Sequence, residues 1–508
     1  MLGALAGLLA AAVALGAGEL VAGVVGPASS PVVAVGNAVV ALTPEPVKDA
    51  AIATFGQADK VALVTGTLVL LAGYAVVIGL VALRRPRLGV AGVVLFGLLG
   101  AVSAVTRPAA GPFDVLPSLA GTAAGVLALL ALLRPLSPRE EPEPTPARAG
   151  TLDRRGFVVA GGVALGAAVL AGGGGRLLQR RFVVAGERAD LALPAPASPA
   201  APLPAGADLS RSVPGVTPLI TGNRDFYRID TAITVPQVRP GDYRLALGGM
   251  FDAPRTYTLR DLYDRGDLLE RDITLTCVSN EVGGDLAGSA RWLGVPLGAL
   301  LRENGIRPES SQLVCRSVDG MTIGAPTRSA LDVPDAMLAI GMNGEPLPVE
   351  HGFPVRMVIP GLYGYVSACK WLTRIDATTY DAFDAYWIER QWAAQGPIKV
   401  ASRIDTPAAL TSFRAGRRAV AGVAWAQTRG IARVEVRIDD GDWADADLAP
   451  AADVDLWRPW VLRAEFAPGR HTLAVRATTA DGETQPDTRA DPFPSGATGW
   501  HTVQVTVT

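Results

Sequence analysis

The chain has 508 residues, of which 49% are hydrophobic, and its formal net charge is −2 with a sequence pI near 6.0. This length is sufficient for three or more structural units. Because the sequence has no dense basic region and its pI is acidic, it does not indicate a nucleic-acid-binding protein. Most of the charged residues follow residue 134. The first part of the chain is therefore predicted to be a membrane protein and the remainder soluble.

Five apolar stretches are long enough to cross a hydrocarbon core of about 30 Å at about 1.5 Å per residue. They cover residues 2–26, 61–83, 88–106, 115–133 and 156–175. Glu19 interrupts the first stretch, and we expect its carboxylate to face the interior of a helix bundle. Residues 31–42 are apolar but too short to span, which favours a re-entrant or interfacial position. The sequence thus predicts a four-helix transmembrane domain over residues 1–135 and a fifth transmembrane helix over residues 156–175.

Arginines follow the second and fourth apolar stretches, at positions 84, 85, 87, 134, 139, 148, 154 and 155. The positive-inside rule places both loops in the cytoplasm, so everything after the fifth stretch is expected on the extracytoplasmic side of the cell membrane. Residues 136–155 form a predicted cytoplasmic linker that ends in a twin-arginine-like motif, Arg154-Arg155. Such a motif exports folded proteins, although paired arginines before a membrane helix also follow from the positive-inside rule alone.

The soluble part has three predicted sections. Residues 176–216 are rich in Ala and Pro and are expected to form an extended tether. Residues 217–395 mix short strands (242–247, 273–277) with short helices (259–262, 295–304), which is typical of an α+β domain. Residues 396–508 contain alternating runs at 420–426, 432–438, 461–466, 471–477 and 501–507. This pattern predicts an immunoglobulin-like β-sandwich.

A single cysteine, Cys277, ends the apolar run 273–277 and enters a turn rich in Ser, Asn and Gly. No second cysteine lies within four residues and no histidine is near, which excludes zinc or c-type haem spacing. A lone thiolate at a strand end suits one bond to a soft metal that brings its other ligands with it. The alternative is a buried, inert cysteine.

Several separated segments extend this local pattern: residues 223–228, 274–284, 290–295, 317–320, 342–356 and 360–371. From about residue 217 to the C-terminus, they resemble the sulfite oxidase family of molybdopterin-dependent oxidoreductases. The C-terminal section resembles that family's dimerisation domain, which implies a homodimer. The resemblance further implies an α+β molybdopterin domain followed by the sandwich, and a molybdenum-molybdopterin cofactor.

The resemblance also implies roles for individual residues. Cys277 would bind molybdenum, and the residues around the pterin would be Asn223, Phe226, Tyr227, Arg228, Asp319, His351, Arg356, Ser367, Ala368 and Lys370. The arginines and the lysine suit an anionic phosphate. Arg228 and Arg429 are the further catalytic candidates, because cations near the metal would attract an oxyanion. Two alternatives remain open: one is that Asp319 only caps its turn, and the other is that Arg429 belongs to an ordinary surface turn.

The predicted function is oxygen-atom transfer on a small sulfur or nitrogen oxo-compound by an exported, membrane-anchored molybdopterin-dependent enzyme. The alternatives are a sulfoxide reductase and a non-catalytic membrane receptor or scaffold. All three histidines lie in the soluble part, so the apolar helices offer no bis-histidine haem ligation and we expect no haem. Electrons would pass to a separate electron-transfer protein or a quinone-linked membrane partner. Cys315 and Cys369 could form a disulfide or remain free.

Overall fold

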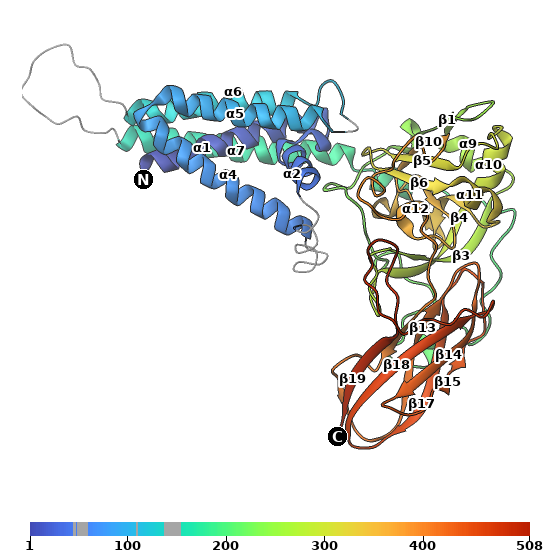
Figure 1. Ribbon diagram of the computed structural model, residues 1–508. Helices are drawn as coiled ribbons and strands as arrows, with labels where there is room; N and C mark the ends of the chain where they lie inside the picture. Colours follow the sequence, from blue (N-terminus) through green and yellow to red (C-terminus); the bar gives the residue numbers. More distant parts are fainter. Residues whose placement is uncertain (44–46, 48–58, 108–109, 137–153) are drawn as a thin grey trace, which may run out of the picture. The chain divides into compact units, whose positions relative to one another are not determined.

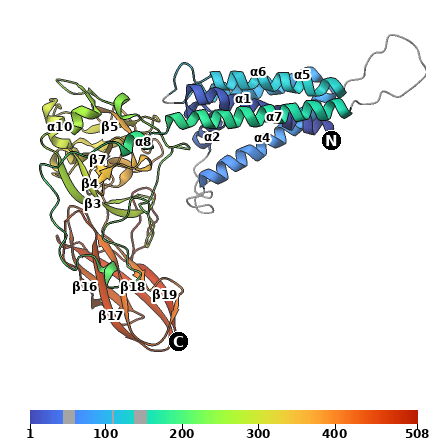
Figure 2. The same cartoon turned by 180° about the vertical axis from the view of Figure 1, so that it is seen from behind.

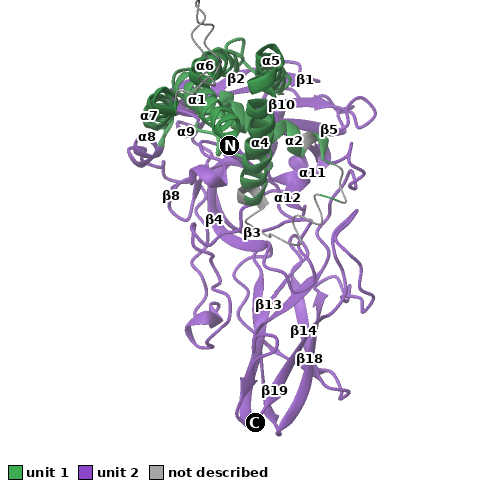
Figure 3. Ribbon diagram, turned by 90° about the vertical axis from the view of Figure 1, so that its left-hand side faces the viewer, with its two compact units in different colours: residues 1–184, 231–237 green, residues 185–230, 238–508 purple. Residues whose placement is uncertain are grey.

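The computed structural model describes residues 1–43, 47, 59–107, 110–136 and 154–508, so most of the predicted linker 136–155 lies outside the described residues. The chain divides into two compact units (Figure 3). Unit 1 comprises residues 1–184 and 231–237, and unit 2 comprises residues 185–230 and 238–508.

Unit 1 is helical (Figure 1). Its helices are α1 (Leu2–Val25), α2 (Pro31–Leu42), α4 (Asp59–Arg84), α5 (Pro86–Val105), α6 (Leu116–Leu133) and α7 (Arg154–Gln179). All except α2 are long and apolar enough to cross a membrane. They coincide with the five apolar stretches of the sequence, although α7 begins before residue 156 and continues past residue 175. Residues 31–42 form a separate helix of 12 residues.

Small residues allow the helices of unit 1 to approach closely. A Cβ atom added to Gly7 of α1 would lie 1.9 Å from the carbonyl oxygen of Ala75 in α4. Likewise, a Cβ atom on Gly121 of α6 would lie 2.6 Å from the carbonyl oxygen of Ala14 in α1. Helices α1 and α7 also run side by side, as both views show (Figures 1 and 2). Backbone contact through glycine is a common way for apolar helices to associate in lipid.

The first part of unit 2 contains two sheets, of which the first is mixed, because β1 and β10 are parallel, and the second is antiparallel. One has the strand order β2-β1-β10-β5-β6, formed by Thr256–Thr258, Arg244–Gly249, Leu372–Thr378, Gln312–Ser317 and Thr322–Pro326. The other has the order β3-β4-β7-β8, formed by Leu269–Thr276, Ala287–Pro296, Met337–Met342 and Glu345–Pro346, with β9 (Arg356–Val358) paired to β7. The short helices are α8 (Ala185–Ala189), α9 (Leu259–Tyr263), α10 (Leu297–Glu303), α11 (Thr327–Asp332) and α12 (Gly364–Ser367). One apolar core joins both sheets and includes Leu245, Leu313 and Leu338.

Two segments of this part differ from their predicted form. The helix predicted over residues 295–304 begins only at Leu297, because Val295 and Pro296 still pair with β7 as part of β4. The Ala/Pro-rich section, predicted to be an extended tether, is partly helical, because α7 continues to Gln179 and α8 lies within it, and its later part packs against the rest of unit 2. Ser198 forms a parallel bridge with Leu269, and the side chain of Leu193 covers Gly341, where a Cβ atom would lie 2.8 Å from it.

The last part of unit 2 consists of two further sheets. One has the order β11-β13-β17-β16, formed by Ala401–Thr406, Gly416–Trp425, Arg458–Phe466 and Asp447–Leu448. The other has the order β12-β19-β18-β14-β15, formed by Ser412–Phe413, His501–Val507, Gly469–Thr479, Ile431–Ile438 and Ala444–Asp445. Side chains of both sheets share one buried core, with the fully buried Trp460 in it. The five predicted runs all correspond to strands, whereas β11 and the short strands β12, β15 and β16 were not predicted.

Candidate functional site

Cys277 follows directly after β3 and is held by its own loop. Its backbone N–H donates to the carbonyl oxygen of Leu286 (2.9 Å), and its carbonyl oxygen accepts from the N–H of Asn280 (3.1 Å). The side chain of Asn280 closes the loop by accepting from the N–H of Leu286 (2.8 Å). The thiol is free and only 9% of the residue is exposed. Burial raises the pKa of the Cys277 thiol, while hydrogen bonds from Ser279 and the charge of Lys370 act in the opposite direction.

Tyr227, which lies near this thiol, belongs to a cluster of aromatic rings. The rings of Phe226 and Tyr227 stack at 5.2 Å, and Phe226 also meets the ring of His351 edge-on at 5.4 Å. Gly288 in β4 makes room for this cluster, because a Cβ atom there would lie 2.9 Å from the Phe226 ring. Burial, and to a smaller extent the Cys277 thiolate, raise the pKa of the Tyr227 hydroxyl well above its usual value. The phenol therefore remains a neutral hydrogen-bond donor beside Cys277.

Arg356 is a buried cation in β9, with 5% of its surface exposed. Its guanidinium donates to the carbonyl oxygens of His351 (3.2 Å) and Ala368 (3.3 Å), while its Nε has no partner. It lies over the face of Trp292 at 5.1 Å. No carboxylate among the residues that the structure describes forms an ion pair with it. Burial lowers the pKa of Arg356 to about 10, because a charge buried without an anion is costly.

Lys370 provides a second cation close by. Its Nζ pairs with the carboxylate of Asp230 at 2.8 Å and donates to the carbonyl oxygen of Glu350 at 3.2 Å. Arg228 shares the same carboxylate, with its Nε 2.8 Å from Asp230 Oδ2. Burial lowers the pKa of Lys370 to about 8, and Asp230 opposes this shift. Two cations thus share one described carboxylate, which leaves the pocket with positive charge.

His351 and Asn223 connect the loop before β9 to the segment that carries Phe226. The Nε2 of His351 lies 2.9 Å from the carbonyl oxygen of Asn223. The side-chain oxygen of Asn223 accepts from Asn343 at 2.8 Å. Burial lowers the pKa of His351 to about 4, so the ring is neutral near pH 7. Gly352, with a φ of 109°, follows it in a left-handed turn, and a Cβ atom there would lie 3.0–3.1 Å from Arg356 and Lys370.

Three other predicted pterin residues have mainly local contacts. The Ser367 hydroxyl donates to the carbonyl oxygens of Leu362 and Tyr363, both at 3.0 Å. Ala368 contributes the carbonyl oxygen that Arg356 contacts. Asp319 accepts from the N–H of Met321 at 3.2 Å, in a turn where Gly320 has a φ of 87°. This contact is the turn cap that the alternative interpretation of Asp319 describes.

Arg429, the candidate from the sandwich part, is not brought into contact with Cys277. Its guanidinium pairs with Glu483 and donates to the carbonyl oxygen of Ile398 at 3.2 Å. It lines a separate cavity of about 340 Å³ together with Asp453 and Trp457. The turn that carries Arg429 nevertheless adjoins β3, since the side chain of Gln427 donates to the carbonyl oxygen of Thr274 at 2.7 Å.

Sequence reasoning missed Tyr363 and Asp230. Burial, with a smaller contribution from the nearby Cys277 thiolate, raises the pKa of Tyr363 to about 12. Tyr363 lies within residues 360–371, a segment already singled out, so its phenol could have been considered. Asp230 lies two residues after Arg228, and this short spacing between opposite charges is the sequence feature that indicates an ion pair. Cys315 and Cys369, which could have formed a disulfide, are both free and buried.

The protein donors near Cys277 fit a cofactor better than a bare ion. The part of the chain that the structure describes contains no group of three or more His, Cys, Asp or Glu side chains able to hold a metal. A soft metal bound to Cys277 would need further ligands from its own organic group. The unpaired Nε of Arg356 and the buried charge of Lys370 suit the anionic part of such a group.

Comparison with known proteins agrees with this donor set. Residues 232–387 match the family described as oxidoreductase molybdopterin binding domain. The mitochondrial sulfite oxidase of Rattus norvegicus is 29% identical over 340 residues, which cover 57% of this chain and 62% of that protein. The catalytic subunit MsrP of the protein-methionine-sulfoxide reductase of Ralstonia nicotianae is 32% identical over 213 residues, which cover 38% of this chain and 61% of MsrP.

Among solved structures, the sulfane dehydrogenase SoxCD from Paracoccus pantotrophus has the same fold over 56% of this chain and 81% of its own, with 24% identity and a TM-score of 0.50. Unit 2 therefore contains a molybdopterin-binding oxidoreductase domain. This domain is similar to that of the sulfite oxidases, as the sequence resemblance predicted. The chain spans less than two thirds of the length of the rat sulfite oxidase and of MsrP.

Proposed function

We propose that this protein is a membrane-anchored molybdenum oxidoreductase that transfers an oxygen atom to or from a small sulfur or nitrogen oxo-compound. The observation that carries the proposal is a free, buried thiol near the cation Lys370, together with a second buried cation, Arg356, that adjoins Lys370 at Gly352. When bound, the cofactor would supply two-electron redox chemistry and carry the transferred oxygen. The protein would position the cofactor and the substrate.

The predicted roles of the side chains follow from their contacts. Cys277 is the proposed metal ligand. Arg356 and Lys370 would neutralise the phosphate of the pterin, with neutral His351 as a further hydrogen-bonding group. Asn223, Phe226, Tyr227, Ser367, Ala368 and Asp319 would line the remaining pterin surface. Arg228 is proposed to contribute to both the pterin and the substrate pocket, through the carboxylate that it shares with Lys370.

Arg429 is proposed as a substrate-attracting cation at the side of the sandwich. Its partner Glu483 is exposed, so the pair is open to water and its attraction is weak. An incoming oxyanion could compete for the guanidinium at little cost. We also propose that the two-sheet part of unit 2 is an immunoglobulin-like domain and that two copies of the chain form a homodimer through it.

The similarity to MsrP supports reduction of a sulfoxide as the second candidate reaction. A non-catalytic receptor is the candidate from another class. The test is molybdenum analysis of the protein from a molybdenum-replete host, followed by sulfite and sulfoxide assays with oxidising and reducing dyes. Stoichiometric molybdenum with turnover in one direction supports the enzyme and sets its direction. Metal-free protein from that host contradicts it.

We further propose that the five apolar helices span the cell membrane, that unit 2 is exported through the Arg154-Arg155 signal, and that no haem is bound. The proposed boundaries are those of the sequence: residues 1–135, 136–155, 156–175, 176–216, 217–395 and 396–508. The arginines between the spans support this orientation. Protease added to intact spheroplasts should digest unit 2 and spare residues 84–87. Protection of unit 2 would contradict the orientation.

Electrons are proposed to leave or enter through a separate electron-transfer protein or a quinone-linked membrane partner. Deleting residues 1–135 while retaining Arg154-Arg155 should preserve activity with dyes and abolish coupling to the respiratory chain. If coupling to the respiratory chain is retained, the deleted helices serve only to anchor the protein in the membrane.

A further inference from the structure

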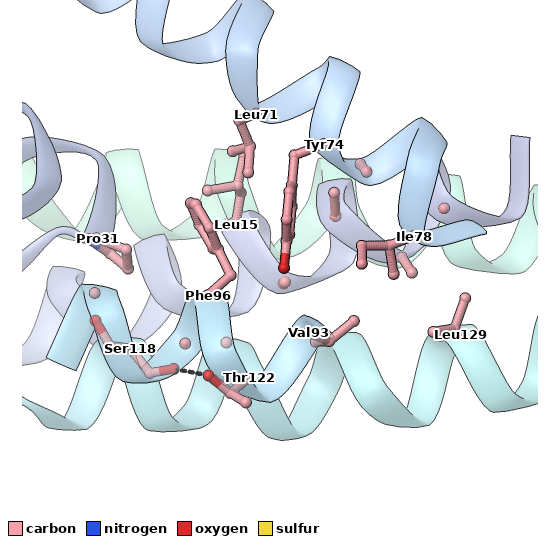
Figure 4. A pocket seen from close by; sticks show the side chains of 18 of the residues that line it. Leu15, Pro31, Leu71, Tyr74, Ile78, Val93, Phe96, Ser118, Thr122 and Leu129 are labelled. Atoms are coloured by element: carbon pink, nitrogen blue, oxygen red, sulfur yellow. Dashed lines mark hydrogen bonds between the residues drawn. The ribbon is translucent and has the colours of Figure 1, made fainter. Parts of the chain in front are cut away.

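A cavity lies inside unit 1, between helices α1, α2, α4, α5 and α6 (Figure 4). Its volume is about 80 Å³, several times the roughly 10–15 Å³ that one water needs. The lining is almost entirely apolar and includes Leu15, Leu71, Ile78, Val93 and Leu129. Such a lining disfavours water, so the space suits an apolar organic group.

The helix geometry explains why this space exists. At Gly7, helices α1 and α4 touch through their backbones, since a Cβ atom there would lie 1.9 Å from the carbonyl oxygen of Ala75. Past this point on α1, the lining residues include Ala10, Ala11 and Ala14. These short side chains do not fill the space beside α4. The tight crossing therefore leaves an opening next to it.

One polar atom in this apolar wall has no partner. Ser118 of α6 lines the cavity and is 4% exposed, and its hydroxyl forms no hydrogen bond in the structure. The other two hydroxyls of the lining are satisfied, because Tyr74 donates to the carbonyl oxygen of Gly92 (2.9 Å) and Thr122 donates to that of Ser118 (2.7 Å). A buried hydroxyl without a partner costs free energy, so Ser118 lacks an acceptor.

The wall opposite offers flat surfaces. The rings of Tyr74 and Phe96 lie 5.7 Å apart with an interplanar angle of 33°, and Figure 4 shows both reaching into the space between α4 and α5. Gly100 leaves room in front of the serine, since a Cβ atom there would lie 3.0 Å from its hydroxyl oxygen. An occupant of this cavity should therefore be apolar and flat, and should carry one oxygen acceptor.

We propose that this cavity binds the ring of a membrane quinone, with one quinone carbonyl oxygen accepting a hydrogen bond from Ser118. A lipid acyl chain would fill apolar space equally well, but it has no acceptor along its length and would leave the serine unsatisfied. This inference rests on the proposed redox function. It adds that the chain itself contains a binding site for the quinone that would carry the electrons. Binding alone can be measured without turnover.

The test uses the full-length chain in lipid nanodiscs, photolabelled with an azido-substituted ubiquinone analogue. We expect label on α4, α5 or α6, and we expect excess decylubiquinone, but not excess palmitate, to prevent it. Ser118→Ala should weaken decylubiquinone binding about three- to tenfold, the value of one hydrogen bond. Gly100→Ala, which places a methyl group before the hydroxyl, should also weaken it. Ser103→Ala, on α5 outside the lining, is the matched control.

A purely structural role for Ser118 would give a different result. Removing an unsatisfied buried hydroxyl should leave the quinone-free Tm unchanged or higher, so weaker binding without loss of stability identifies a ligand contact. Equal competition by palmitate, or unchanged labelling in both Ser118→Ala and Gly100→Ala, would overturn the proposal. Dye-linked turnover is measured in parallel. Turnover without quinone binding contradicts only this inference, whereas molybdenum-free, inactive protein contradicts the proposed function.

Discussion

Units 1 and 2 bury polar groups in opposite ways. Unit 1 associates through glycine contacts such as Gly7 with Ala75, and its central cavity has a single unpartnered hydroxyl, that of Ser118. Unit 2 instead buries full charges: Arg356 has no carboxylate partner among the described residues, and Lys370 shares Asp230 with Arg228. Charges are far more costly to bury than hydroxyls. The comparison teaches that each unit retains an unsatisfied group where a ligand of matching chemistry is expected.

The largest effect should follow from replacing the proposed metal ligand. Cys277→Ser exchanges a soft thiolate for a hard, mostly protonated hydroxyl, so turnover should fall by orders of magnitude while the fold and the pterin content persist. The measurements are dye-linked activity, molybdenum and pterin per chain. Cys315→Ser changes another buried thiol and should retain near-wild-type turnover. If Cys277→Ser turns over normally, unit 2 loses its proposed metal ligand.

A second prediction concerns the packing of unit 1. Gly7→Leu would drive a side chain into the backbone of α4, and overpacking of this kind costs at least about 1–3 kcal/mol. We expect a lower yield of folded protein and faster proteolysis of residues 1–136. Gly73→Leu is the matched control on α4, since no atom lies within 4 Å of a Cβ placed there.

The outcome in unit 2 makes this experiment informative. Dye-linked turnover per molybdenum should be the same in Gly7→Leu and Gly73→Leu, because the proposed chemistry uses only residues of unit 2. A fall in turnover restricted to Gly7→Leu would show that the two units are not energetically independent.

The sequence predicted the features that depend on local pattern. The five apolar stretches became helices because a span of this hydropathy has one stable backbone form in lipid, and Cys277 lies at a strand end because its apolar run stops at a Ser/Asn/Gly turn. The site residues were proposed from resemblance, and their contacts required the fold. Residues 295–296 show the limit: their pairing with β7, which lies about 40 residues later, outweighs the local helix pattern. Tyr363 approaches Cys277 only through tertiary packing, which periodicity does not reveal.

A third prediction tests whether Arg356 awaits an anion. Arg356→Met removes an unpaired buried cation, so the cofactor-free protein should gain about 1 kcal/mol of unfolding free energy or more. The cofactor content of protein from a replete host should fall at the same time. Arg316→Met removes a partly exposed cation that pairs with Asp376, and it should change stability by no more than about 1 kcal/mol. A destabilised cofactor-free Arg356→Met would instead assign the guanidinium a packing role.

The smallest effect is a pH dependence specific to unit 2. Asp455 is 3% exposed and accepts a hydrogen bond from the N–H of Thr428 at 2.7 Å. Burial, with smaller contributions from Asp453 and Asp335, raises the pKa of Asp455 to about 7 from its usual value of 3.8. A raised pKa means that the folded state holds this proton more tightly than the unfolded state. The stabilisation of the folded state by protonated Asp455 is therefore complete below pH 3.8 and is lost as the pH rises through 7.

Asp455→Asn mimics the protonated form and can still accept from Thr428, so the variant should lack this loss. The difference in Tm between the variant and wild type should grow from pH 5 to pH 8 and level off above it. The pKa values of His351 and His501 are both lowered to about 4, so their contributions to the stability of the protein are lost as the pH falls. Both histidines are present in the variant and in wild type, and their contributions cancel in the Tm difference. Asp440→Asn, at an exposed turn, should give a flat difference. If the Tm difference between Asp455→Asn and wild type does not change with pH, the carboxylate of Asp455 is hydrated in the wild-type protein. Ionisable groups would then be less deeply buried at Asp455 than at Arg356.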